Sequence, residues 1–374
     1  MGFPWKIPTL SSPLPYILFT RFVITNWKIR RQTLRSDDSI LTYSTMFLVD
    51  KTHFTSHFKS IGKKSTHSHK GYQLPARFFD EKVILHLKTL NPPSDSSIIS
   101  LSWLSKAVSF LSMVHCEAQD QISSLGSESD YYQTLYMDYS MRVLDLCNLI
   151  SSAVQQLTER RLLMNLGLRL IKSSGQIPSP EKLKKAKDAL IRSVHHTQDT
   201  SKEKGIRAKA LIEELTSGIN SLPLGKTSSA KDLIRRTLHG LGILTVFTAS
   251  VLVSVLYGQY DPVEVRVPAE FLWSDSVNRL QTQIFELIKP KQTKGWLLEL
   301  DDTASRAQAV CDLLDEIVVD DNRSRLENGV KELVNAASNF SDVVDGLTNG
   351  VNGLFNSVLK TRNGVLDGVR KATW

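Results

Sequence analysis

The stretch from Thr237 to Tyr260 constrains the fold of this chain more than any other, because its 24 positions contain no Asp, Glu, Lys or Arg. Its centre, Leu241 to Tyr257, is apolar or small on every side when wound as a helix, so it leaves no face for water. Such a helix fits two settings, a lipid bilayer or the middle of a helical bundle. What the rest of the chain can do depends on which of these two settings the helix occupies.

The composition is that of a folded protein, since 374 residues with 41% hydrophobic side chains can bury one or two sizeable cores. The net charge of +8 is concentrated in residues 1–70, which hold 11 Lys and Arg against three Asp. Residues 71–374 balance, with 35 basic and 35 acidic side chains. A nucleic-acid-binding domain carries its excess charge on a folded face, so this distribution argues against a nucleic-acid partner.

Residues 1–74 are expected to form a basic, disordered tail, because no helical or strand period runs through them. Their basic, Ser/Thr-rich composition is typical of an organellar transit peptide. The prolines at positions 4, 8, 13 and 15 interrupt the amphipathic helix that such a peptide needs, which argues against a chloroplast transit peptide. An alternative is that Met46 is the natural start and that residues 1–45 are absent from the natural protein.

Residues 75–374 are predicted to form a single helical domain, because apolar residues recur at three- and four-residue steps and no stretch alternates as a strand does. The expected helices cover about 75–90, 101–126, 129–157 with a helical continuation through 162–171, 180–191, 201–222, 271–287, 296–319 and 330–365. One more helix, capped by Ser228 or Ser229, is expected to run into the apolar stretch 237–260. Helices as long as the third pack as rods along other rods. The predicted fold is all-α, an elongated multi-helix bundle in which long antiparallel helices surround one central apolar helix.

The C-terminal segment carries the most regular repeat in the chain. From Val330 to Val365 apolar residues recur in alternating steps of three and four over five heptads, which is the seam of a coiled coil. Gly346, Gly350 and Gly353 each weaken this helix by roughly 1 kcal/mol relative to Ala. Packing must offset that loss, and the packing partner is either this chain's own bundle or another chain.

No catalytic or cofactor-binding residue is predicted. The Gly-Lys-Thr sequence at 225–227 resembles the end of a phosphate loop, but the motif needs a glycine five positions earlier, where this chain has Asn220. A helical pattern, and not a strand, precedes it. His115 and Cys116 are neighbours in sequence, yet adjacent residues of a helix point about 100° apart and do not face each other.

No metal site is predicted either. The histidines at positions 53, 57, 67 and 69 have no cysteine or carboxylate cluster beside them, so we interpret them as part of a solvated basic tail. The three cysteines, Cys116, Cys147 and Cys311, lie far apart in helical patterns. An odd number without a spaced framework favours reduced thiols in a cytosolic setting.

Several motifs follow one another in a characteristic order. Leu-Ser-Trp-Leu at 101–104 is followed by Tyr-Met-Asp-Tyr-Ser-Met-Arg-Val-Leu-Asp-Leu-Cys-Asn at 136–148. Farther along, Arg235 and Arg236 lead into the apolar stretch, and Val-Pro-Ala-Glu-Phe-Leu-Trp-Ser follows at 267–274. In order and spacing these motifs resemble those of the plant BYPASS family, and the resemblance extends over residues 75 to 370, including the Asn/Gly-rich C-terminal helix.

The resemblance implies a plant-specific protein without an assigned enzymatic activity that acts in the control of root and shoot development and of a root-derived mobile signal. Some members of the family are tied to the exocyst tethering complex, which implies an exocyst subunit as one partner. The resemblance supplies no catalytic, cofactor-binding or metal-binding residues that could be carried over to this chain.

We therefore expect a non-enzymatic helical scaffold or adaptor in plant growth and development, cytoplasmic or membrane-associated, that acts through protein contacts on its helical faces. The alternatives are an exocyst-associated trafficking factor and a single-pass membrane protein with a helix at about 239–258. In the membrane alternative, the basic residues before the span and the acidic residues after it would hold the N-terminal side in the cytosol. These are Lys231, Arg235 and Arg236 on one side and Asp261 and Glu264 on the other. The amphipathic segments on both sides need each other for packing, which favours burial of the apolar helix inside a bundle.

Overall fold

The computed structural model describes residues 71–91, 99–125, 129–172, 179–194, 199–258, 261–288, 297–316 and 323–372. Residues 1–70 of the expected tail, the alternative start at Met46 and the four tail histidines lie outside these ranges. The tail, the boundary at residue 74 and the alternative start therefore stay predictions.

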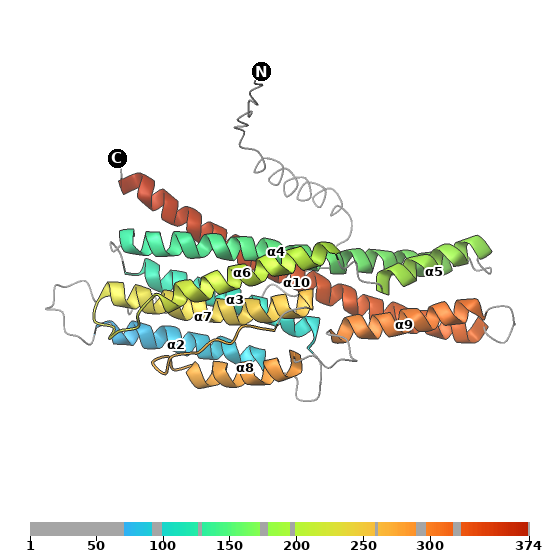
Figure 1. Ribbon diagram of the computed structural model, residues 1–374, viewed down its shortest axis with the longest axis horizontal. Helices are drawn as coiled ribbons and strands as arrows, with labels where there is room; N and C mark the ends of the chain where they lie inside the picture. The colour runs from blue at the N-terminus through green and yellow to red at the C-terminus, as the bar shows by residue number, and fades with distance from the viewer. Residues whose placement is uncertain are drawn as a thin grey trace, which may run out of the picture. The chain divides into compact units, whose positions relative to one another are not determined.

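All secondary structure in the described ranges is helical, which confirms the predicted all-α class (Figure 1). The elements are α2 (Gln73–Leu87), η2 (Lys88–Leu90), α3 (Leu101–Ser123), α4 (Ser129–Lys172), α5 (Pro180–Val194), α6 (Asp199–Asn220), α7 (Ala230–Tyr257), α8 (Ser274–Ile288), α9 (Leu298–Asp315) and α10 (Arg323–Ala372). The segments expected at 129–157 and 162–171 are one continuous helix of 44 residues. No breaker residue separates them, so the helix runs on.

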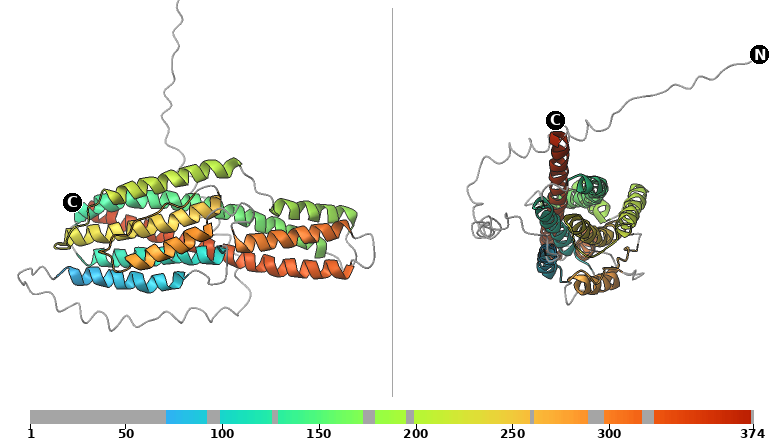
Figure 2. Two further views of the ribbon diagram at one scale, coloured as in Figure 1. Left: turned by 60° about the horizontal axis from the view of Figure 1, so that its bottom comes forward. Right: turned by 90° about the vertical axis from the view of Figure 1, so that its left-hand side faces the viewer.

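The unit His67–Trp374 contains two hydrophobic cores that share two helices. The larger core is built from α2, α3, α6, α7, α8, the first part of α4 and the later part of α10. The smaller core packs the end of α4 and the beginning of α10 with α5 and α9. Since the two long helices enter the cores in opposite order, they run antiparallel, as Figure 2 shows.

Helix α7 lies at the centre of the larger core and packs against α2, α3, α4, α6 and α8. Ser229 begins it, in a capping box with Asp232, as expected for a serine at this position, and Gly258 ends it in the left-handed conformation with φ of 65°. Among the described helices, only α7 is long and apolar enough to cross a membrane, and 94% of its most apolar window is buried in the structure. Neighbouring helices therefore cover the apolar surface of α7.

The heptad seam of α10 packs on this chain's own helices. Its central residues Val344, Leu347 and Val351 are buried, and α10 lies against α3, α4 and α9. A methyl group added at Gly346 would lie 3.2 Å from the Ser105 hydroxyl. Gly346, one of the glycines that weaken the helix, thus also lets α3 approach its backbone.

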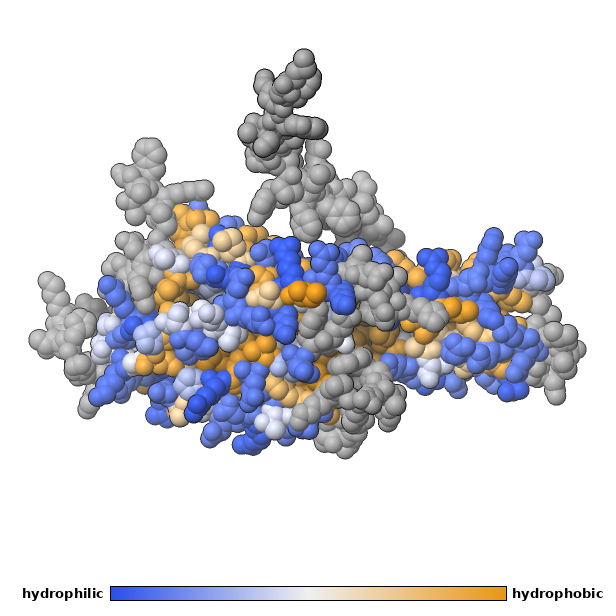
Figure 3. Space-filling model, in the orientation of Figure 1, coloured by the Kyte–Doolittle hydropathy of each residue, from blue (hydrophilic) through white to orange (hydrophobic). Residues whose placement is uncertain are grey.

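The surface in Figure 3 is hydrophilic over most helices, with hydrophobic side chains showing in strips between them. This pattern is what amphipathic helices produce when their apolar faces meet inside a bundle. A few large apolar side chains on α2 and α4 are exposed despite it, among them Leu74, Leu85, Leu162 and Leu166.

Candidate functional site

The buried polar residues of the larger core are arranged as junctions between helices, and the first of these joins α2 to α7. Asp80 of α2 is 1% exposed and accepts two hydrogen bonds from the Arg236 guanidinium, of 3.1 and 2.6 Å. The backbone N–H of Leu272 (3.1 Å) and the indole N–H of Trp273 (3.2 Å) also donate to this carboxylate. One aspartate thus fixes α2, α7 and the segment before α8 to each other.

An aromatic group completes the same junction. The Arg236 guanidinium lies 4.5 Å from the centre of the Phe271 ring and donates to the Glu270 carbonyl at 3.0 Å. Phe271 in turn packs on Trp273, with ring centres 4.6 Å apart. The backbone at Gly240 lets both rings approach α7, because a methyl group there would lie 2.9 Å from the Phe271 ring. The paired charge is therefore enclosed by apolar rings.

A second junction holds the beginning of α3. Ser100 caps the helix by accepting from the Trp103 N–H at 3.0 Å, and the Trp103 indole donates to the Leu90 carbonyl at 3.1 Å. The carboxylate of Glu299, from α9, accepts from the N–H groups of Leu101 (2.7 Å) and Ser102 (3.2 Å). A carboxylate at a helix N-terminus satisfies unpaired donors and the helix dipole together.

A third junction connects α3, α4 and α7 through a chain of three side chains. The Tyr139 hydroxyl lies 3.0 Å from His115 Nε2 and 2.7 Å from the Thr245 hydroxyl. Thr245 donates its own proton to the Leu241 carbonyl, so Tyr139 donates to Thr245 and His115 donates to Tyr139. Burial lowers the pKa of His115 from 6.5 to about 3, so the imidazole is neutral at physiological pH.

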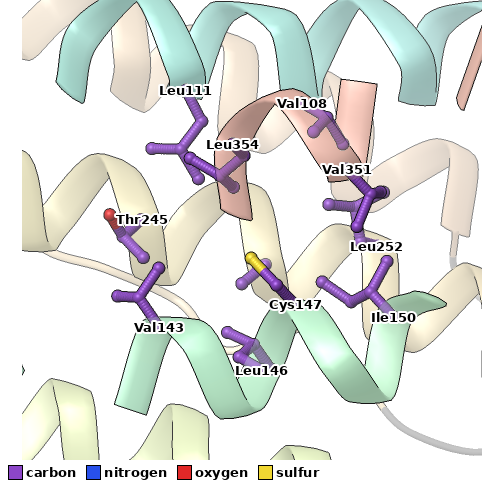
Figure 4. Close-up of a pocket in the computed structure, with 11 residues that line it drawn as sticks. Val108, Leu111, Val143, Leu146, Cys147, Ile150, Thr245, Leu252, Val351 and Leu354 are labelled. Carbon is purple, nitrogen blue, oxygen red and sulfur yellow. The ribbon is translucent and has the colours of Figure 1, made fainter. Parts of the chain in front are cut away.

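The third junction lies beside a small apolar cavity between α3, α4, α7 and α10, which Thr245 helps to line (Figure 4). Its volume is about 10 Å³, which is about the space for one water molecule and far below that of a ligand pocket. In Figure 4, the Cys147 thiol and the Thr245 hydroxyl are the polar groups among the labelled side chains. Burial raises the pKa of the Cys147 thiol to about 12, so no thiolate forms there at neutral pH.

The residues considered for chemistry in the sequence are not brought together. Cys116 is exposed and contacts Ser357 of α10, whereas its neighbour His115 points inward to Tyr139. The Gly-Lys-Thr sequence at 225–227 lies in the loop between α6 and α7. Among the described residues, no group of three or more His, Cys, Asp and Glu side chains is placed to hold a metal ion.

Sequence reasoning missed Asp80 and Glu299 as junction residues. The sequence does contain a sign of both roles, because each residue is acidic and stands at a position that its helix buries. Asp80 lies next to Phe79 and three residues before Val83 on the buried side of α2. A carboxylate on an apolar face predicts a buried partner, but the pattern does not name which cation or backbone group provides it.

The fold and its junctions define an all-helical protein whose buried polar side chains hold helices together. The family model described as protein ROH1-like matches residues 214–369. Protein BPS1, chloroplastic, of Arabidopsis thaliana is 24% identical over 327 residues, which is 85% of this chain and 90% of that protein. These matches confirm the resemblance to the BYPASS family that the motifs indicated.

Two further relatives are both called UPF0496 protein 4, from the japonica and indica subspecies of Oryza sativa. They are 28% identical to this chain over 274 and 271 residues, respectively, and each match covers 71% of the chain. The chain spans only 58% of the length of these rice proteins. No solved structure matches the chain.

The motifs that carry the family resemblance coincide with the junctions. Trp103 lies in the first motif, Tyr139 in the second, and Arg236 and Trp273 lie in the basic step and the 267–274 element. In each case the side chain contacts a different helix or the segment next to it. The described roles of these motif residues are therefore in the packing of the bundle.

Proposed function

We propose that this chain is a non-enzymatic helical scaffold or adaptor that acts through protein contacts in the regulation of plant growth and development. The observation that carries the proposal is that the most reactive side chains of the larger core take part in packing. His115 and Cys147 are buried, and burial moves the pKa of each away from neutrality, to about 3 and about 12. Neither residue is tuned as a base or nucleophile at physiological pH.

The developmental part of the proposal rests on the relation to BPS1 and on the family resemblance of the motifs. The name of BPS1 describes that protein as chloroplastic, whereas for this chain we propose a cytoplasmic or membrane-associated location. An exocyst-associated trafficking factor is the alternative that the family resemblance favours. An exocyst subunit is accordingly the first protein partner to test.

A single-pass membrane protein is the second alternative, because α7 has the length and composition of a span. The packing of α10 speaks against it. Helices α3 and α4 precede α7 in the chain and α10 follows it, yet α10 packs on both. A span would place α10 on the opposite side of the membrane and expose the buried seam.

The scaffold proposal is tested by rescue and partner recovery in plants that lack the corresponding gene. Chains carrying His115→Gln or Cys116→Ser should restore growth as the unchanged chain does when they accumulate to the same level, because neither substitution removes a reacting group. Immunoprecipitation from the rescued plants should recover one reproducible set of proteins with all three chains. Loss of rescue by a stable, normally abundant variant, together with turnover of a small molecule, would overturn the proposal.

A further inference from the structure

The outer side of the last part of α4 carries two exposed leucines between two opposite charges. Leu162 and Leu166 are 60% and 49% exposed, and the exposed side chains of Glu159 and Arg169 stand on either side of them. Steps of three, four and three residues keep these four side chains on one line along the helix, as in the seam of a coiled coil. We call this line the α4 stripe. The opposite side of the same stretch is buried in the smaller core.

Within the ranges that the structure describes, the two charges of the α4 stripe form no ion pair. Glu159 accepts one hydrogen bond, of 3.5 Å, from Gln155 on the same helix. Arg161, on the other side of α4, is by contrast paired with Asp345 of α10 at 2.6 Å. This part of α4 lies at the outside of the bundle beside α5 (Figure 1). The stripe is thus an apolar centre with a carboxylate at one end and a guanidinium at the other.

The order of these side chains is self-complementary. If two α4 helices lie antiparallel about a two-fold axis midway between Leu162 and Leu166, each residue faces the one equally far from that midpoint on the other side. Leu162 then faces Leu166 of the second copy, and Glu159 faces Arg169 of the second copy. A parallel pair in register would instead set Glu159 against Glu159 and Arg169 against Arg169, which is repulsive.

We propose that the α4 stripe is the interface of an antiparallel dimer of this chain. The two-fold axis makes every contact twice, so the dimer gains two leucine layers flanked by two ion pairs at each end of the apolar centre. Both hydrophobic cores stay closed, because only side chains already on the surface take part. The inference goes beyond the scaffold proposal and does not depend on it.

Other occupants fit the α4 stripe less well than a second copy. Its two charges cancel, so a charged membrane surface gains no net attraction from them. A different protein would have to supply leucines and opposite charges in the matching order, whereas a second copy of the chain already carries them. The contact involves one helix from each copy, which is typical of a weak, concentration-dependent dimer.

The test is sedimentation equilibrium of the full chain with a reductant present. We expect a monomer–dimer equilibrium over a concentration range of about 1 to 100 μM. The double substitution Leu162→Ser with Leu166→Ser should raise the dissociation constant by about tenfold or more, because the leucines of both copies lose their apolar contacts.

Charge reversal tests the antiparallel arrangement itself. Glu159→Arg alone should raise the dissociation constant by about tenfold, because each copy then sets two cations against each other. Arg169→Glu alone should do the same with two anions. The chain that carries both reversals should dimerise as the unchanged chain does, because the two-fold axis again pairs opposite charges.

The matched control is the pair Leu74→Ser and Leu85→Ser on α2, whose leucines are also exposed, at 70% and 55%. This control should dimerise as the unchanged chain does, and circular dichroism should show the same helicity for all variants. The inference would be overturned by a chain that stays monomeric over the whole range or by α4 leucine variants that dimerise normally. A double reversal that fails to restore the dimer would overturn it as well. None of these outcomes bears on the rescue experiment for the scaffold proposal.

Discussion

At the scale of single residues, Asp80 shows how one side chain can fix several elements. It receives both arms of Arg236 and two further donors from the segment before α8. Asp80→Ala should lower the free energy of unfolding by about 3–5 kcal/mol, because it leaves a buried guanidinium without its partner. Denaturant unfolding followed by circular dichroism measures the change.

The neighbouring surface pair supplies the control for Asp80. Glu81 and Arg77 are 3.0 Å apart, with both side chains more than half exposed. Glu81→Ala should change the free energy of unfolding by less than about 1 kcal/mol, because solvent screens the pair. Equal losses for the two alanine variants would mean that Asp80 is not a junction.

His115 makes the stability of the fold depend on pH. Its pKa falls from 6.5 to about 3 on folding, so the unfolded chain binds the proton more readily. The stabilisation is complete above pH 6.5 and is lost as the pH falls from there toward 3. The free energy of unfolding should therefore drop by about 2 kcal/mol more between pH 7.5 and pH 5 in the unchanged chain than in His115→Gln.

The measurement is a set of urea unfolding curves across that pH range for both chains. His239, whose pKa burial also lowers, is present in both and cancels from the difference. Parallel pH profiles for the two chains would show that His115 is not buried as the structure places it.

At the same scale, sequence reasoning recovered some residues and missed others for a physical reason. Ser228 or Ser229 was expected to cap the helix that leads into the apolar stretch, because capping depends on residues a few positions away, and the structure has Ser229 as the cap. The link between Glu299 and Leu101 joins residues 198 positions apart. Local patterns carry no information about which distant N–H groups will meet that carboxylate.

At the scale of the helices, Gly242 of α7 and Gly353 of α10 have opposite roles. A methyl group added at Gly242 would lie 2.6 Å from Ile219 Cγ1, where α6 packs on α7. A methyl group added at Gly353 would have no neighbouring atom within 4 Å. Gly353→Ala should stabilise the protein by about 0.5–1 kcal/mol through helix propensity. The Gly242→Ala protein should be less stable than the Gly353→Ala protein by at least about 1 kcal/mol, because the clash of the added methyl group with Ile219 offsets its gain in helix propensity.

Thermal unfolding of the two alanine variants side by side measures this difference, and the common gain in helix propensity cancels. A Gly242→Ala protein as stable as Gly353→Ala would show that α6 and α7 do not approach closely at this point.

The existence of each described helix could be predicted because its apolar period is local. The helical continuation expected through 162–171 is part of α4, which is one helix from Ser129 to Lys172. Burial on α2 could also be predicted only in part, since Phe78 fits the apolar period of the helix expected at 75–90 and yet is 45% exposed. Periodicity identifies a face but does not say whether a neighbour covers all of it.

At the scale of the whole bundle, α4 and α10 tie the two cores of the unit His67–Trp374 together. The sequence predicted the central apolar helix and left its setting open between lipid and protein. Long-range packing favours the setting inside the bundle, because α10 covers the same helices that precede α7 in the chain. The packing of α10 on α3 and α4 is the central claim, since a membrane span through α7 would place α10 on the other side of the membrane from α3 and α4.

The contact between Cys116 of α3 and Ser357 of α10 tests this claim directly, since the Sγ and Oγ atoms are 3.5 Å apart. Ser357→Cys adds a second thiol beside Cys116, and mild oxidation of membranes and cytosol from expressing cells should form an intramolecular disulfide, seen as a faster band on a non-reducing gel. Asn356→Cys is the control, because the adjacent helical position points about 100° away. The bundle predicts the disulfide with Ser357→Cys and none with the control. An absence of the disulfide, with the two thiols labelled from opposite sides of a sealed membrane, would contradict it.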